Sequence, residues 1–344
     1  MDKLKIDKKG YVTFYAAAEY NGKLYIADSN NKGLLEYDLT TKETIIKNVF
    51  MAENYMNNYG QAFTYMNEVW FIPLRDYERI AIYNVENNKI DYLEIPKSKH
   101  KCEYIPFTDF IIKDCYVYMT PAHYDSLLKI DLKNRSIFRI SIGVEEYSGS
   151  GYPITTASVL KENKIYICPF NNNKFIIYNT DTDSIEKIIS LKDKNAYTNI
   201  FFYREKLYLV PLKISEGLTL LDWNNDVEEK KEIKCSSDYS DYECLGSVVD
   251  GTGVMFFPNK GEAIVRYNYI NENVEYLKFE FENRSKEFCF NRSRWIGINK
   301  SIVRADNSET PCLLCNNGEI EIIDIKIPED YFIKEILMEI EERK

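Results

Sequence analysis

A short hydrophobic pattern returns at regular intervals along the whole chain. Five-residue runs rich in β-branched, aromatic and aliphatic residues end on Pro or Asp. Seven such runs occupy residues 24–28, 69–73, 117–121, 165–169, 207–211, 254–258 and 302–306. The last residues of successive runs are 42 to 48 positions apart. Internal repetition at this period indicates a repeat architecture in which each unit is one supersecondary element.

A second marker keeps the same phase in every unit. Ten or eleven residues after each run, another apolar stretch ends in Asp or Asn. These residues are Asp38, Asn84, Asp131, Asn179, Asp222, Asn268 and Asn316. The side-chain oxygen of such a residue can accept a hydrogen bond from the backbone two residues later, which sets a turn. We therefore assign these residues a structural role in turns.

Each unit divides into four short strands. In the fourth unit the expected strands are residues 154–160, 164–168, 174–179 and 184–190. The second strand of a unit is apolar on both faces, which is typical of a sheet packed between two others. Four strands in about 45 residues is the period of a β-propeller blade. The sequence thus predicts an all-β protein, with a seven-bladed β-propeller over residues 11–326.

The units resemble those of kelch-like and YVTN-like propellers. Residues 23–28 and 36–40 show this likeness best. The Gly-Gly pair of kelch units is missing, and so are the Gly-His and Trp-Asp marks of WD40 blades; the reversed pair Asp222-Trp223 occurs once. The resemblance implies the fold and gives only a weak guide to function.

Two terminal segments lie outside the repeat. Residues 1–10 form an N-terminal segment that could supply an edge strand at 4–6. Residues 327–344 predict a short amphipathic α-helix that begins near Pro328. Its apolar stripe consists of Phe332, Ile333, Ile336, Leu337 and Ile340. This helix either packs on the propeller or docks a partner.

Composition narrows the function classes. The 344 residues are 45% hydrophobic and carry a net charge of −10, which disfavours a nucleic-acid-binding surface. No stretch approaches the roughly 20 apolar residues that span a bilayer, so no membrane partner is expected. The first residues do not read as an export signal. We therefore expect a cytoplasmic protein whose eight cysteines are reduced.

One face of the predicted propeller is rich in aromatic residues and arginine. The loops before the first strands and between second and third strands meet at the channel mouth of such folds. The candidate ligand-binding residues in these loops are Tyr55, Tyr59, Arg75, Tyr77, His123, Tyr124, Tyr152, Tyr197, Tyr242, Arg292, Arg294 and Trp295. Aromatic residues with arginine suit recognition of a protein, peptide or glycan. Alternatively, these tyrosines fill gaps between blades in a chain that has 28 of them.

Catalytic signals are sparse. His100 and His123 are the only histidines, so a three-His zinc site cannot form, and no metal or cofactor is expected. His123, next to Tyr124 and Asp125, is the best candidate for acid–base chemistry. A lyase of the streptogramin-inactivating type could work with one His and a carboxylate-bound Mg²⁺, but no paired His or Glu motif supports it. The spacing Cys312-x-x-Cys315 is more typical of chance core thiols than of a redox or metal pair.

Two functions remain open. The sequence favours a non-catalytic binding propeller that recognises a protein, peptide or glycan through the channel mouth. The alternative is a propeller hydrolase or lyase that acts on a small molecule or glycan at the same mouth through His123. A structure separates the two, because an enzyme needs His123 within reach of a carboxylate and facing a pocket.

Overall fold

The structure of the chain is a computed structural model. It describes residues 12–51, 59–74, 79–99, 106–143, 153–170, 172–192, 196–244, 246–257, 263–278, 290–297, 300–305, 312–328, 330, 331, 334 and 338. Contacts divide the chain into two compact units. Unit 1 comprises Met1–Pro73, Arg79–Leu93 and Arg294–Lys344, and unit 2 comprises Leu74–Glu78 and Glu94–Ser293.

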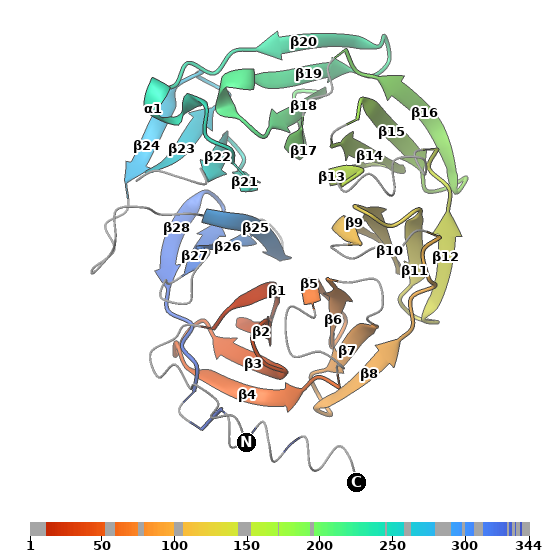
Figure 1. The fold of residues 1–344 in the computed structure, drawn as a ribbon, viewed down its shortest axis with the longest axis vertical. Helices are drawn as coiled ribbons and strands as arrows, with labels where there is room; N and C mark the ends of the chain where they lie inside the picture. The colour runs from red at the N-terminus through yellow and green to blue at the C-terminus, as the bar shows by residue number, and fades with distance from the viewer. Residues whose placement is uncertain are drawn as a thin grey trace. The chain divides into compact units, whose positions relative to one another are not determined.

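The strands form seven antiparallel sheets of four, which makes the protein a seven-bladed β-propeller as predicted (Figure 1). Blades 1 and 2 consist of β1 (Phe14–Tyr20), β2 (Lys23–Asp28), β3 (Gly33–Asp38), β4 (Thr44–Val49), β5 (Tyr59–Tyr65), β6 (Glu68–Pro73), β7 (Ile80–Asn84) and β8 (Lys89–Leu93). Blades 3 and 4 consist of β9 (Phe107–Lys113), β10 (Tyr116–Pro121), β11 (Leu127–Asp131), β12 (Ser136–Ile140), β13 (Thr155–Lys161), β14 (Lys164–Pro169), β15 (Lys174–Asn179) and β16 (Ser184–Ser190).

The remaining three blades continue the pattern. They consist of β17 (Tyr197–Tyr203), β18 (Lys206–Pro211), β19 (Leu218–Asp222), β20 (Val227–Lys231), β21 (Gly246–Val249), β22 (Gly253–Phe257), β23 (Ala263–Asn268), β24 (Val274–Lys278), β25 (Phe290–Gly297), β26 (Lys300–Ala305), β27 (Cys312–Asn316) and β28 (Glu319–Ile323). Blade 5 also carries the 3₁₀ turn η2 (Ile214–Glu216), and α1 (Ser237–Ser240) precedes blade 6. The expected strands of the fourth unit match β13–β16 within one residue at each end.

In blades 1 to 6 the second strand is buried along nearly its whole length. In β2, β6, β10, β14 and β18 every residue after the first is buried. Outer strands such as β8 and β12 alternate between exposed and half-buried positions. A strand that is apolar on both faces must have packing on both faces, and this explains the unbroken hydrophobic runs from which the repeat was found.

The turn between the third and fourth strands is built as the Asx pattern predicts. In blade 1, Asp38 Oδ1 accepts hydrogen bonds from the backbone N–H groups of Thr40 and Thr41, at 2.8 and 3.0 Å. The same pair of bonds recurs at the markers of blades 2 to 6, which are Asn84, Asp131, Asn179, Asp222 and Asn268. These bonds hold the pKa of Asp38 below its usual value.

Four positions after the markers of blades 1 to 6, the backbone enters the left-handed region. The φ values at Lys42, Asn88, Arg135, Asp183, Asp226 and Glu272 lie between 49° and 64°. A residue with a Cβ is strained there, and glycine would relieve the strain.

Acidic residues at this left-handed position connect neighbouring blades of unit 2. Lys129 of blade 3 pairs with Asp183 of blade 4 at 2.6 Å. Likewise, Lys187 of blade 4 pairs with Asp226 of blade 5 at 2.6 Å. Lys231 of blade 5 pairs with Glu272 of blade 6 at 2.9 Å. The strained turn position therefore presents a carboxylate to the preceding blade.

In unit 1, residues from the two ends of the chain join blade 1. The Val12 N–H donates to Ile325 O at 2.8 Å, and Lys300 of blade 7 pairs with Glu19 at 2.6 Å. Ile323 and Ile325 lie in one buried cluster with Val12 and Phe14. The last strand, β28, ends at Ile323, inside the expected propeller range of residues 11–326. The proposed edge strand at 4–6 lies outside the described residues.

The expected C-terminal helix is present, and its described residues 331, 334 and 338 are helical. Tyr331 is fully buried in the core cluster of blade 1, where its hydroxyl accepts the Gly33 N–H at 3.0 Å. A Cβ at Gly33 would lie 2.1 Å from that hydroxyl oxygen. Burial raises the pKa of Asp28, against hydrogen bonds from Asn31, the Asn30 backbone and the Tyr331 hydroxyl. The tail thus packs on blade 1; the stripe of Phe332, Ile333, Ile336, Leu337 and Ile340 lies outside the described residues.

The left-handed turn positions predict a difference between two glycine substitutions. Glu162 has φ 57° and is exposed, so Glu162→Gly should raise the free energy of unfolding by about 0.5–1 kcal/mol through relief of strain. Glu272→Gly should gain less, because it also removes the ion pair with Lys231. Urea unfolding of both variants measures the difference. An equal gain for both would show that the inter-blade pair contributes nothing.

The contact between Tyr331 and Gly33 predicts strong coupling. Gly33→Ala should lower the free energy of unfolding by about 1–3 kcal/mol, because the new methyl group meets the tyrosine ring. In a Tyr331→Ala background the methyl group has room, so the added loss should fall below about 1 kcal/mol. A double-mutant cycle by denaturant unfolding tests this, and additive losses would contradict the packing described.

Candidate functional site

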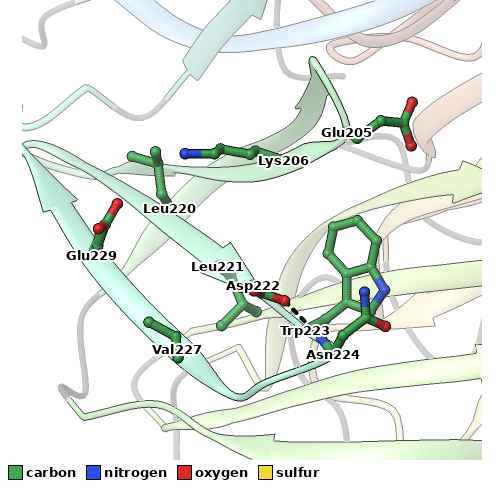
Figure 2. Close-up of a pocket in the computed structure, with 9 residues that line it drawn as sticks. All are labelled: Glu205, Lys206, Leu220, Leu221, Asp222, Trp223, Asn224, Val227 and Glu229. Carbon is green, nitrogen blue, oxygen red and sulfur yellow. Dashed lines mark hydrogen bonds between the residues drawn. The ribbon is translucent and has the colours of Figure 1, made fainter.

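A pocket of about 300 Å³ lies on blade 5, within unit 2. It is lined by Glu205, Lys206, Leu220, Leu221, Asp222, Trp223, Asn224, Val227 and Glu229. These residues come from the turn between β17 and β18, from β19 and β20, and from the Asx turn that joins the last two strands. Figure 2 shows Trp223 and Asn224 on one side of the pocket and Lys206 and Leu220 on the other.

The Asx turn positions Trp223 at the pocket. Asp222 Oδ1 accepts the Asn224 and Asn225 N–H groups, and its Oδ2 accepts Asn225 Nδ2 at 2.8 Å. These bonds, led by the Asn225 side chain, hold the pKa of Asp222 below its usual value. Lys187 of blade 4 donates to Trp223 O at 2.9 Å, which fixes the same turn from the neighbouring blade.

Two aromatic rings, one from blade 4 and one from blade 5, support the indole. Trp223 lies edge-to-face against Tyr166 at 5.5 Å and against Phe202 at 5.4 Å, and Tyr166 and Phe202 are 5.0 Å apart. Edge-to-face pairs at these separations are favourable beyond their buried area. Trp223 is therefore a braced, half-buried side chain that still lines the pocket.

A lysine of blade 4 extends over these rings. The Lys161 Nζ lies 4.9 Å from the centre of the Phe202 ring and 5.6 Å from that of Trp223. It forms an ion pair with Glu205, whose side chain is 85% exposed and which also lines the pocket. The aromatic cluster therefore already holds an ammonium group of the chain itself.

Three described tyrosines of the predicted mouth are buried. Tyr59 packs against Phe50, with ring centres 4.6 Å apart, and is 3% exposed. Tyr124 is 1% exposed and donates its hydroxyl to Pro96 O. Tyr197 is fully buried and shares a 3.1 Å hydrogen bond with the Thr219 hydroxyl. Their burial favours the packing role that the sequence left open beside binding.

The other predicted mouth residues are either half-buried or outside the described part of the structure. Tyr242 is half-buried beside Tyr239, with ring centres 6.3 Å apart. Arg292, Arg294 and Trp295 lie on β25, and their side chains are outside the described part of the structure. The residues Tyr55, Arg75, Tyr77 and Tyr152 lie outside the described residues altogether.

The candidate acid–base residue His123 and the nearby carboxylate of Asp125 lie in different surroundings. His123 is half-buried on the β10–β11 loop and does not line the blade 5 pocket. Asp125 is buried and accepts bonds from Lys99 N at 2.9 Å, from the Ser126 hydroxyl at 3.0 Å, and from Arg139. Burial acts to raise the pKa of Asp125, but these three partners outweigh it and hold the pKa below its usual value. This carboxylate holds loop and strand together.

The cysteines behave as core residues. Both Cys312 and Cys315 are buried on β27, and none of the six cysteines in the described part of the chain forms a disulfide. No group of three or more His, Cys, Asp or Glu among the described residues is arranged to hold a metal ion. In that same part of the chain, no helix combines the length and hydropathy that crossing a bilayer requires.

The sequence contains one signal for the blade 5 pocket that was assigned no role. The pair Asp222-Trp223 places a tryptophan directly after a turn marker, where the other units have Leu, Val, Thr, Tyr or Asn. A large aromatic residue at an exposed turn is unusual unless something covers or uses it. Its partners Tyr166 and Lys161 come from another blade, so the pocket itself required the structure.

Known structures share the fold. The chain resembles virginiamycin B lyase from Staphylococcus aureus with a TM-score of 0.63 and 11% identity, covering 88% of this chain and 94% of that one. A streptogramin B lyase gives 0.60 and 10%, covering 91% and 94%. KlHsv2 with loop 6CD replaced by a Gly-Ser linker gives 0.53 and 9%, covering 88% and 92%. At such identities the likeness shows the fold alone, and it does not test the kelch-like resemblance.

No protein-family profile matches the chain, and no curated protein matches it in sequence.

Buried thiols predict slow alkylation in the folded protein. Burial raises the pKa of Cys315 to about 12 and also raises those of Cys168 and Cys244 well above their usual value, so little thiolate forms at pH 8. Iodoacetamide should leave these three unmodified in the native protein. All eight cysteines should react after unfolding without reductant, as counted by mass spectrometry. Fewer than eight would reveal a disulfide.

Proposed function

We propose that the protein is a non-catalytic binding propeller that recognises a protein or peptide partner. The observation that carries the proposal is the blade 5 pocket, where a braced indole, aliphatic side chains and carboxylates line one concavity. Partially exposed aromatic side chains held rigidly in a concave surface are typical anchors of protein interfaces. The proposed partner is neither a nucleic acid nor a membrane, in keeping with the net charge of −10.

The channel mouth remains a second contact surface in this proposal. The residues proposed for this surface are Tyr55, Arg75, Tyr77, Tyr152, Tyr242, Arg292, Arg294 and Trp295. Loops on a rigid scaffold commonly extend an interface beyond its anchor.

A propeller lyase is the second candidate. Its support is the shared fold with two streptogramin-type lyases and the half-buried His123 on a loop. Against it, the neighbouring carboxylate of Asp125 already holds Arg139, Ser126 and the Lys99 backbone.

The binding proposal is tested by blocking the pocket. Val227 is 51% exposed, so Val227→Trp should fill the pocket and leave the core intact. Ile45→Trp, at a 42% exposed position on the outer strand β4 of blade 1, is the matched control. A partner isolated on the wild-type protein should bind the control equally and Val227→Trp at least tenfold more weakly, as measured by calorimetry with the purified partner. Equal binding by all three proteins would contradict the pocket as the contact site.

Turnover separates the two candidates. The protein incubated with quinupristin and Mg²⁺ should leave the antibiotic intact, as followed by liquid chromatography. Loss of quinupristin that His123→Ala abolishes would favour the lyase over the binding module.

A further inference from the structure

We propose that the blade 5 pocket receives a basic side chain, lysine or arginine, from the partner polypeptide, and that Lys161 competes with it. This inference rests on the proposed binding function and names the chemistry of the group that is bound.

The first argument is charge. Three carboxylates line the pocket, those of Glu205, Asp222 and Glu229, against the single ammonium of Lys206. Asp222 is already committed to its own turn and Glu205 to the ion pair with Lys161, so Glu205 can meet a ligand only when Lys161 gives way. Three carboxylates against the two ammonium groups of Lys206 and Lys161 still leave a negative balance, which attracts a cation and repels an acidic group.

The second argument is the aromatic wall. Lys161 shows that an ammonium group is accommodated over Phe202 and Trp223, at 4.9 and 5.6 Å. Attraction between a cation and an aromatic face grows with desolvation, and tryptophan is the strongest ring for it. The indole therefore offers a second contact to a cation that enters from the pocket side.

The third argument is the aliphatic lining. Leu220 lies directly opposite Glu229 in the β19–β20 register, and Val227 begins the same outer strand. Lysine and arginine bury their methylene stems against such side chains while their charged ends meet carboxylates. A small hydrated cation would not cover the parts of Leu220 and Val227 that line the pocket.

Lys161 acts as an internal competitor in this arrangement. It pairs with Glu205, the carboxylate at the exposed edge of the pocket, and its charge lies beside the same rings. An incoming cation must either displace this ammonium from Glu205 or tolerate its repulsion. Removing the Lys161 charge should therefore strengthen binding, a result that loss of a purely structural contact would not produce.

Blade 3 provides a matched control for this lysine. Lys129 lies 4.4 Å from the Tyr116 ring centre and 5.7 Å from that of Tyr118, and it pairs with Asp183 at 2.6 Å. The arrangement of rings, ammonium and carboxylate is the same, but none of these residues lines the blade 5 pocket.

The test uses blocked dipeptides as probes on the full chain. Acetyl-leucyl-arginine amide and its lysine counterpart are titrated against ¹⁵N-labelled protein, with the citrulline analogue as the uncharged control. The indole N–H signal of Trp223, assigned with Trp223→Phe, should shift with both basic probes. Citrulline should bind roughly tenfold more weakly.

Variants that remove single charges then show which charged side chains affect binding of the probe. Glu229→Gln should weaken binding of the arginine probe several-fold, and Lys161→Met should tighten it several-fold. Lys129→Met should leave it unchanged. Equal binding of arginine and citrulline, no shift at Trp223, or weaker binding by Lys161→Met would each overturn the inference. If Val227→Trp still abolishes partner binding in that case, the proposed binding function is retained. Only the inference that the bound group is a basic side chain is then wrong.

Discussion

The turn between the third and fourth strands of blades 1 to 6 is the constraint on which the repeated structure depends. Its first side chain accepts two backbone N–H groups, and its fifth residue takes a left-handed backbone conformation. In blades 4, 5 and 6 that fifth residue is acidic and pairs with a lysine of the preceding blade. Glycine would relieve the backbone strain there but would remove the carboxylate. Local strain and contact between blades are thus properties of one residue, and they oppose each other.

The fold was predictable because its signals are local. A strand buried on both faces must be apolar throughout, and an Asx turn needs a particular side chain at one position. Both requirements repeat in the chain with the period of a blade, so even short segments such as Lys174–Asn179 were placed correctly. The pocket was not predictable in the same way. Trp223 belongs to blade 5, whereas Tyr166 and Lys161 belong to blade 4, and only the packing of the two blades brings them together.

The tyrosines show that residue type alone does not separate a binding residue from a core residue. A ring such as Tyr197 can fill space between strands and satisfy its hydroxyl inside the protein, as the Thr219 contact does. Exposure depends on which side of a pleated strand the residue occupies, and the loops before first strands give no such register. Asp125 is a related case. It lies two residues from His123 in the sequence, but in the structure its carboxylate accepts a hydrogen bond from Arg139.

The contact between Gly33 and Tyr331 joins residues that are 298 positions apart. Blade 1 is made before the other six blades, but its core includes the side chain of Tyr331, which follows blade 7 in the sequence. Its hydrophobic surface stays incomplete until residue 331 has been added. Blades 3 to 5 have no such requirement, since the contacts described for their cores come from nearby blades. The order in which blades become stable therefore need not follow the order in which they are translated, since blade 1 depends on a residue that comes after blade 7.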